Sequence, residues 1–223
     1  MTVAIDGPAG TGKSTIAQRV AEKADLFYLN SGNFYRAIAW HVLGHGIDPD
    51  DTTKVTEAAR GLDLDVWHRG IVLNGKRIRT ELRDERVDAH VAEISSSPSV
   101  REVVNSHLRR ISAGRDVIAE GRDMTTVVFP DADVKIYLDA SIDSRAQRRY
   151  EDLNETVPLE EVRRRIAERD RIDTTKTVGR LKLDPGALYI DTSHLTIDQV
   201  CDIVLNAILS AKDNTSTGAL GQS

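Results

Sequence analysis

A glycine-rich loop close to the first residue constrains the fold of this chain more than any other feature. Gly7, Gly12, Lys13 and Ser14 fit the spacing G-x-x-x-x-G-K-[ST] within the stretch "AIDGPAGTGKST". The apolar residues 3–5 before the loop predict a short buried strand, and apolar residues recur at helical spacing after it. This motif between a strand and a helix is typical of a phosphate-binding loop in an α/β fold.

The chemistry of such a loop follows from its residue types. Glycines let the backbone curl so that successive N–H groups point at phosphate oxygens, and the helix N-terminus adds partial positive charge. Lys13 can reach the β- and γ-phosphates, and the Ser14 hydroxyl can join the ligands of Mg²⁺. The residues predicted to bind a nucleoside triphosphate are Gly7, Pro8, Ala9, Gly10, Thr11, Gly12, Lys13, Ser14 and Thr15.

The rest of the chain predicts an α/β fold with a parallel sheet flanked by helices, of the phosphate-binding-loop NTPase type. Three further apolar runs, Asp116–Gly121, Val134–Ser141 and Ala187–Ser193, predict core strands. They alternate with helical patterns, as right-handed crossovers between parallel strands require. The predicted helices are Ser14–Ala24, Ser31–Gly44, Val87–Ser95, Pro98–Ser112, Ser141–Leu153, Leu159–Arg171 and Ile197–Lys212.

Two segments depart from this alternation. Residues 62–78, "LDLDVWHRGIVLNGKRI", alternate apolar and polar side chains around Arg69-Gly70 and Asn74-Gly75, which predicts a small antiparallel hairpin or meander. Residues 145–180 are rich in arginine and acidic residues, which predicts a helical hairpin covered with salt bridges on the surface. The last segment, residues 213–223, is small and polar, and we expect it to be disordered.

The bulk properties exclude several classes of function. A net charge of −5 gives no indication of nucleic-acid binding. The chain has no apolar run long enough to span a membrane, and we expect no secretory leader because the first strand begins at Val3. Cys201, the single cysteine, lies among apolar residues and predicts a buried side chain. A cytoplasmic protein fits these observations.

The loop alone does not decide where the γ-phosphoryl group goes. The chain lacks the N-K-x-D and D-x-x-G patterns of GTPase switches, and Asp139 could be either a metal-binding carboxylate or a helix N-cap. Arg36, Arg101 and Arg122 lie in separate short motifs. Arginines that converge on a second phosphate chain are what a kinase for a small acceptor needs.

Seven blocks of the sequence form a recognisable series: "AIDGPAGTGKST", "SGNFYRAIA", "PSVREVV", "EGRDMTTVVFPDADVKIYLDAS", "RAQRR", "RDRIDTTK" and "LYIDTSHLTIDQV". In these blocks and in their order the chain resembles the bacterial cytidylate kinases, within the nucleoside monophosphate kinases. The resemblance implies a core formed by residues 1–30, 105–144 and 179–212. It also implies a monophosphate-binding domain over residues 31–104 and a lid over residues 145–178.

The resemblance also implies roles for individual residues. Arg36 and Arg122 match arginines on the acceptor's phosphate, and Ser31 matches a further acceptor contact. Arg101 and Asp123 match the pair that reads the base. The remaining matches are Arg169, Asp173 and Lys176 at the lid's end, and the lid arginines Arg145 and Arg148 that approach the transferred phosphoryl group together with Lys13.

The base-reading assignment has a physical reason. Cytosine presents an N4 amino donor beside the N3 and O2 acceptors. The carboxylate of Asp123 could accept from N4, while the guanidinium of Arg101 donates to N3 and O2. Uracil would face Asp123 with an oxygen and leave buried polar groups unpaired. For Asp123 a helix cap or an ion pair with Arg122 remains the alternative.

The chain departs from the family pattern at three positions. Lys176 stands where the family usually has arginine, which keeps the charge but loses the bidentate fork. Asn30 stands where aspartate is frequent, and Ala92 stands where some relatives have a serine that helps to hold the base.

The sequence therefore predicts phosphoryl transfer from MgATP to CMP, and to dCMP, by a monomer whose partners are these small molecules rather than nucleic acid or a membrane. The alternatives are a kinase for UMP, AMP or shikimate, and a nucleotide-dependent regulatory module without a small acceptor.

Overall fold

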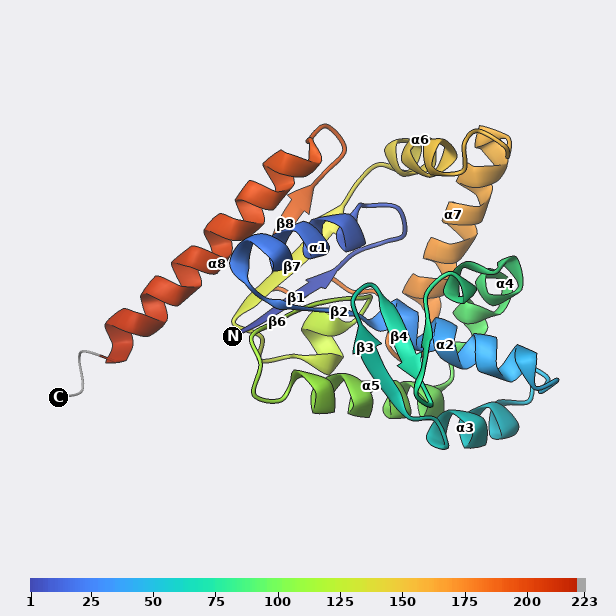
Figure 1. The fold of residues 1–223 in the computed structure, drawn as a ribbon. Coiled ribbons are helices and arrows are strands. Elements are labelled where there is room, and N and C mark those ends of the chain that lie inside the picture. Colours follow the sequence, from blue (N-terminus) through green and yellow to red (C-terminus); the bar gives the residue numbers. More distant parts are fainter. Residues whose placement is uncertain (220–223) are drawn as a thin grey trace. The chain divides into compact units, whose positions relative to one another are not determined.

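The core of the protein is a five-stranded sheet in the order β2-β6-β1-β7-β8. The computed structural model describes residues 1–219, with side chains through Asp213 (Figure 1). The strands are β1 (Thr2–Asp6), β2 (Phe27–Asn30), β6 (Val117–Glu120), β7 (Val134–Asp139) and β8 (Leu188–Asp191). The predicted fold class is confirmed, and the structure adds β2, which the sequence pattern did not indicate.

Strand β1 pairs in parallel with β6 on one side and with β7 on the other. Ile5 lies opposite Glu120 in β6 and Ile136 in β7. A central parallel strand is covered on both faces, so its residues are apolar in succession rather than alternating. Val3, Ala4 and Ile5 are accordingly all fully buried.

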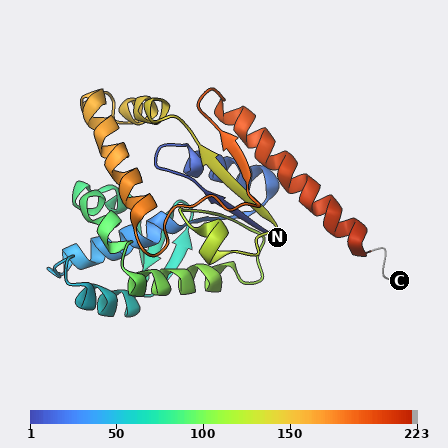
Figure 2. The same ribbon diagram turned by 180° about the vertical axis from the view of Figure 1, so that it is seen from behind.

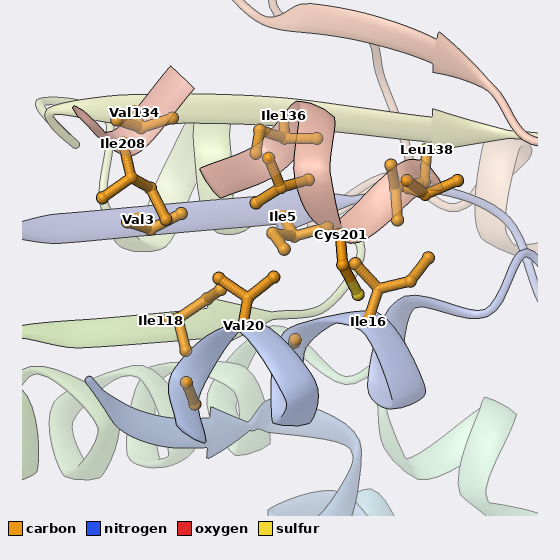
Figure 3. Close-up of a cluster of buried hydrophobic side chains, with 14 of the residues drawn as sticks. Val3, Ile5, Ile16, Val20, Ile118, Val134, Ile136, Leu138, Cys201 and Ile208 are labelled. Atoms are coloured by element: carbon orange, nitrogen blue, oxygen red, sulfur yellow. The ribbon is translucent and has the colours of Figure 1, made fainter. Parts of the chain in front are cut away.

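One face of this sheet is covered by α1 (Lys13–Ala24) and α8 (Ile197–Ala219), which also contact each other. Figure 3 shows their apolar side chains pointing at those of β1 and β7. Cys201 of α8 is fully buried in this cluster, which confirms its predicted role as a small apolar side chain. Helix α8 begins with a capping box in which Thr196 and Gln199 exchange hydrogen bonds.

The charged segment forms the predicted helical hairpin of α6 (Ile142–Asp152) and α7 (Leu159–Thr175) (Figures 1 and 2). Its apolar contact is small and centres on Ala146, Val162 and Ile166. Exposed ion pairs cover the rest, such as Glu161 with Arg164 at 2.8 Å. The π-helix η2 (Met124–Val128), which follows β6 and contacts β1, was not predicted from the sequence.

Residues 29–114 contain a second, smaller sheet and four α-helices. The helices are α2 (Ser31–Gly44), α3 (Thr52–Arg60), α4 (Glu85–Ile94) and α5 (Pro98–Ser112), with a short 3₁₀ helix η1 (Glu81–Arg83) before α4. The antiparallel strands are β3 (Leu64–Trp67), β4 (Gly70–Leu73) and β5 (Lys76–Ile78). The meander is as predicted, except that its first turn is at His68-Arg69, because Gly70 already pairs with Trp67.

The chain divides into two compact units. The first contains Met1–Tyr28, Arg115–Arg171 and Leu181–Ser223, and the second contains Leu29–Gly114 and Ile172–Arg180. Of the segment predicted as a lid, residues 145–171 belong to the first unit and residues 172–178 to the second. Helix α8 continues through Ala219, past the Lys212 at which its end was predicted, and residues 220–223 of the predicted tail lie outside the described residues.

Gly7 marks the point where the chain leaves β1 next to β7. Its φ is +150°, and a Cβ at this position would lie 2.0 Å from the carbonyl oxygen of Leu138. Because that oxygen belongs to the backbone of a core strand, it cannot rotate away. Only glycine fits here without separating the two strands.

We therefore expect Gly7→Ala to lower the free energy of unfolding by about 3 kcal/mol or more, since it adds a backbone clash to an unfavourable φ. Gly114→Ala is the matched control, because Gly114 has a φ of +72° with no atom within 4 Å of the added Cβ. It should cost about 1 kcal/mol. Urea unfolding of both variants without nucleotide measures the difference, and equal losses would contradict the role of the Leu138 contact.

Candidate functional site

The glycine-rich loop connects β1 to α1 as predicted. Gly10 and Gly12 have φ values of +81° and +87°, which lets the loop curl before the first turn of α1. The amino group of Lys13 folds back over the loop and donates to the carbonyl oxygen of Pro8 at 2.6 Å. The Thr11 hydroxyl donates to the same oxygen at 3.1 Å. The loop therefore holds its lysine, which is 5% exposed, against its own backbone.

Ser14, the predicted metal ligand, contacts a carboxylate that the sequence did not single out. Its hydroxyl donates to Oε1 of Glu120 at 2.6 Å, and the Tyr28 hydroxyl donates to the same oxygen at 3.0 Å. Among the described residues, no group of three or more His, Cys, Asp or Glu could hold a metal ion. Mg²⁺ in phosphoryl-transfer sites typically takes one or two protein oxygens besides phosphates and water. The oxygens of Ser14 and Glu120 fit that requirement.

Arg122 and Asp123 follow β6 directly, at the same edge of the sheet as the loop that follows β1. The amide of Gly121 donates to the carbonyl oxygen of Ile5 at 2.9 Å and extends the pairing of the two strands to this edge. Asp123 is 1% exposed, whereas Arg122 is half-buried. Asp123 stands at the N-cap position of η2, but its side chain makes no capping hydrogen bond, so the helix-cap alternative is not supported.

A second buried carboxylate lies beneath this turn. Asp6, the last residue of β1, accepts from the amides of Met124 and Thr125, each at 2.8 Å, and from the Thr125 hydroxyl at 2.7 Å. It is fully buried. Desolvation raises its pKa to about 6, although the hydrogen bonds from Thr125 and Met124 act to lower it and the negative charge of Asp123 raises it further.

The two lid arginines on α6 are engaged within the first unit. Arg145 is buried and forms an ion pair with Asp170 of α7. It also donates to the carbonyl oxygens of Ala140 at 2.9 Å and of Ala9 in the loop at 3.1 Å. Arg148 donates to the hydroxyl of Thr192 at 3.1 Å. Of the two, Arg145 directly contacts the phosphate-binding loop.

The N-cap hypothesis for Asp139 is wrong. The hydroxyl of Ser141 caps α6 by accepting from the amide of Ser144. Asp139 instead accepts from the amide of Ala140 at 2.8 Å and from the hydroxyl of Tyr189 at 3.0 Å. Those donors hold its carboxylate at the end of β7.

In the second unit, Ser31 and Arg36 occupy the first turns of α2. Asn30 caps this helix, because its side-chain oxygen accepts from the amide of Asn33 at 3.1 Å. Arg36 is buried, donates to the carbonyl oxygen of Leu82 at 3.0 Å, and forms an ion pair with Asp88 of α4. An asparagine at position 30 thus performs the capping that aspartate would perform.

Arg101 lies on α5 with 3% exposure. Its guanidinium donates to the carbonyl oxygen of Ser95 at 2.8 Å and lies 5.4 Å from the ring centre of Tyr35. The carbonyl oxygen of Ala92, the position where some relatives have serine, accepts from the hydroxyls of Ser95 and Ser96. The contacts with Ser95 and Tyr35 orient the Arg101 guanidinium.

Asp173 and Lys176 also belong to the second unit and form an ion pair at 3.1 Å. Both side chains are less than a tenth exposed. Lysine in place of the family's arginine therefore keeps one charged contact to Asp173. Arg169 lies half-buried on α7 in the first unit.

The predicted residues divide between the two units. The first unit holds the loop, Arg122, Asp123, Arg145, Arg148 and Arg169, and the second holds Ser31, Arg36, Arg101, Asp173 and Lys176. Sequence analysis missed the acidic partners of these groups: Asp6, Asp88, Glu120 and Asp170. Asp6 and Glu120 each end a buried strand, which was a detectable signal, whereas Asp88 and Asp170 are ordinary acidic residues within helices.

The sequence is similar to those of known proteins over most of its length. The sequence profile of the family described as Cytidylate kinase matches residues 3–210. A cytidylate kinase of Borrelia hermsii is 41% identical over 212 residues, covering 92% of this chain and 96% of the relative. One of Caldanaerobacter subterraneus subsp. tengcongensis is 39% identical over 209 residues, covering 92% and 93%.

A solved structure of an uncharacterized protein from Eubacterium ventriosum is similar in fold, with a TM-score of 0.54, 11% identity, and coverage of 94% of this chain and 99% of that chain. No helix in the part of the chain that the structure describes is long and apolar enough to cross a membrane. The family profile and the two relatives, each matching more than nine-tenths of the chain, show that it belongs to the cytidylate kinase family.

Proposed function

We propose that the protein transfers the γ-phosphoryl group of MgATP to CMP and to dCMP, giving the corresponding diphosphate and ADP. The observation that carries this proposal is a buried carboxylate, Asp123, at the sheet edge where the phosphate-binding loop begins. Ligands of open α/β sheets bind at the carboxyl ends of the strands. A phosphate-binding loop and a buried hydrogen-bond acceptor at that edge suit an enzyme that holds ATP and selects a base.

On the donor side, the backbone amides of residues 7–15 would surround the β- and γ-phosphates. Lys13 would exchange its hydrogen bond with the Pro8 carbonyl for a contact with phosphate oxygens, a stronger charge-assisted bond. Ser14 and Glu120 would hold Mg²⁺ directly or through water, and the ion would neutralise charge between the phosphates. The chain's own contribution is to position the phosphates and compensate their charge.

On the acceptor side, Arg36 and Arg122 would bind the phosphate of CMP. No side-chain nucleophile or general base is needed, because the attacking phosphate oxygen is already ionised. Asp88 and the carbonyl of Leu82 hold the Arg36 guanidinium in a defined orientation before the substrate arrives. Catalysis then depends on alignment of the two phosphates and on charge neutralisation.

The base would be read by opposite hydrogen-bonding groups. Asp123 would accept from the N4 amino group, and Arg101 would donate to N3 and O2. Both side chains are nearly fully buried, so a base with the wrong donor pattern would leave one of them without a partner. Uracil would be rejected for this reason.

The lid would comprise residues 145–178 and the monophosphate-binding domain residues 31–104. Arg145 and Arg148 would turn to the transferred phosphoryl group, which requires Arg145 to leave Asp170. Arg169, Asp173 and Lys176 would contact phosphate and ribose. We further propose a cytoplasmic monomer whose partners are ATP, CMP and dCMP, with no nucleic-acid or membrane partner.

The test is ADP release in a coupled assay at fixed MgATP with CMP, dCMP, UMP, AMP, GMP or no acceptor. The proposal expects rapid release with CMP and dCMP and almost none without an acceptor. A rate that does not depend on the acceptor would instead support a hydrolase or regulatory module. Preference for UMP or AMP would support another monophosphate kinase.

Lys13→Ala should lower kcat by about 100-fold or more, because it removes the cation that stabilises charge on the transferred group. Lys23→Ala is the matched control, since Lys23 lies on the same helix with its side chain 50% exposed. It should leave kcat within about twofold of the original value. Near-normal transfer by Lys13→Ala would refute the assigned role of the loop.

Asp123→Asn should lower the ratio of kcat/KM for CMP to that for UMP by about 10- to 100-fold, because the amide can donate to uracil O4. Asp202→Asn, an exposed acid on α8, is the control and should leave the ratio unchanged. The measurement is kcat/KM for both acceptors at saturating MgATP. An equal loss for the two acceptors would mean that Asp123 supports the fold rather than reading the base.

A further inference from the structure

Asp6 is a buried charged group to which the mechanism above gives no role. It lies between the last core residue of β1, Ile5, and the first residue of the phosphate-binding loop, Gly7. Its side chain is fully buried. Burying a carboxylate is costly unless several hydrogen bonds satisfy it. The hydrogen-bond donors to Asp6 therefore indicate its role.

The donors to Asp6 belong to the two residues that follow Asp123. They are the amides of Met124 and Thr125 and the hydroxyl of Thr125, at 2.7 to 2.8 Å. The first amides of a helix have no acceptor within the helix itself. Asp6, at the end of β1, supplies that acceptor to η2.

Because Asp6 accepts from the first amides of η2, the side chain of Asp123 does not have to cap this helix. Its side chain makes no capping hydrogen bond, and its carbonyl oxygen accepts from the amides of Val127 at 2.9 Å and Val128 at 3.1 Å. The backbone of Asp123 is thus fixed by η2, and the start of η2 is fixed by Asp6. Asp6 thereby fixes the stretch of backbone from which the Asp123 carboxylate projects.

The negative charge of the Asp6 carboxylate strengthens its hydrogen bonds with Met124 and Thr125. Hydrogen bonds from N–H and O–H groups to a carboxylate are shorter and about twice as strong as those between neutral groups. A neutral asparagine of the same shape has one acceptor oxygen instead of two and would turn an N–H₂ group towards donors. An apolar residue would leave both amides unsatisfied.

We propose that Asp6 is a positioning residue for recognition of the base: it anchors the turn at residues 123–125 and so sets the orientation of the Asp123 carboxylate towards a pyrimidine amino group. The inference rests on the proposed function, because it assumes that Asp123 reads the base. It also ties the start of the phosphate-binding loop to the base-reading turn through a single residue.

The test compares Asp6→Asn with two variants at the other end of the same contacts. Thr125→Val removes only the hydroxyl donor from a side chain of the same shape, and it lies outside the loop. Thr125→Ser keeps that hydroxyl and is the matched control. Steady-state KM and kcat are measured for CMP, UMP and ATP, with CMP affinity determined by calorimetry.

We expect Asp6→Asn to raise KM for CMP by about 10- to 100-fold, to lower the CMP-to-UMP ratio, and to change KM for ATP by less than about threefold. Thr125→Val should shift KM for CMP in the same direction by about three- to tenfold, and Thr125→Ser should resemble the original protein. In an Asp123→Asn background, Asp6→Asn should have no further effect on the CMP-to-UMP ratio, because it acts through Asp123.

The outcomes separate the two hypotheses. If Asp123→Asn removes the preference for CMP but neither Asp6→Asn nor Thr125→Val changes it, the positioning role is wrong and the proposed function stands. If the unaltered protein shows no preference for CMP, the proposed function itself fails. Should Asp6→Asn not fold, Thr125→Val against Thr125→Ser decides, and equal KM values for CMP in that pair would overturn the inference.

Discussion

The site depends on the parallel pairing of β1 with a neighbour on each side. Because β6 and β7 run in the same direction as β1, the residues that follow all three strands reach one edge of the sheet. The phosphate-binding loop, the turn at Arg122-Asp123 and the start of α6 with its arginines follow these three strands directly. No other property of the chain would bring residues 7–15, 122–123 and 145–148 together, since they are widely separated in sequence. The close approach of Gly7 to Leu138 shows that the pairing of β1 with β7 leaves no room for a side chain at position 7.

In both units, the cations predicted to bind phosphate have anionic or carbonyl partners of their own. Arg36 pairs with Asp88, Arg145 with Asp170 and Lys176 with Asp173, while Lys13 donates to a carbonyl oxygen. A buried cation without such a partner would bear the full cost of leaving water. Under the proposed function, a bound phosphate would replace these contacts. The binding free energy would be the difference between the old contacts and the new ones, which would favour a ligand with several phosphate charges.

The sequence predicted the strands and helices whose apolar residues recur regularly, including the bounds of α2 and α5. It missed α3, because "TTKVTEAAR" has few apolar residues, and β2, because "FYLN" is short. The π-helix η2 has no periodic signature, since its widened turn is held by Asp6 from outside the segment. The loop and the arginines were recognisable from spacing and resemblance. Their acidic partners were not, because an ion pair such as Arg145 with Asp170 depends on which helices lie together.

The first unit is assembled from three separate stretches of chain, with residues 29–114 inserted between Tyr28 and Arg115. This has a consequence for synthesis on the ribosome. Strand β1 is made first, yet its partners at Val117–Glu120 and Val134–Asp139 emerge only after the whole inserted unit. Until then an apolar strand with two unpaired edges stays exposed on the nascent chain. The predicted phosphate-binding loop thus belongs to a sheet that completes its pairing late, and formation of this sheet is governed by long-range pairing rather than by local contacts.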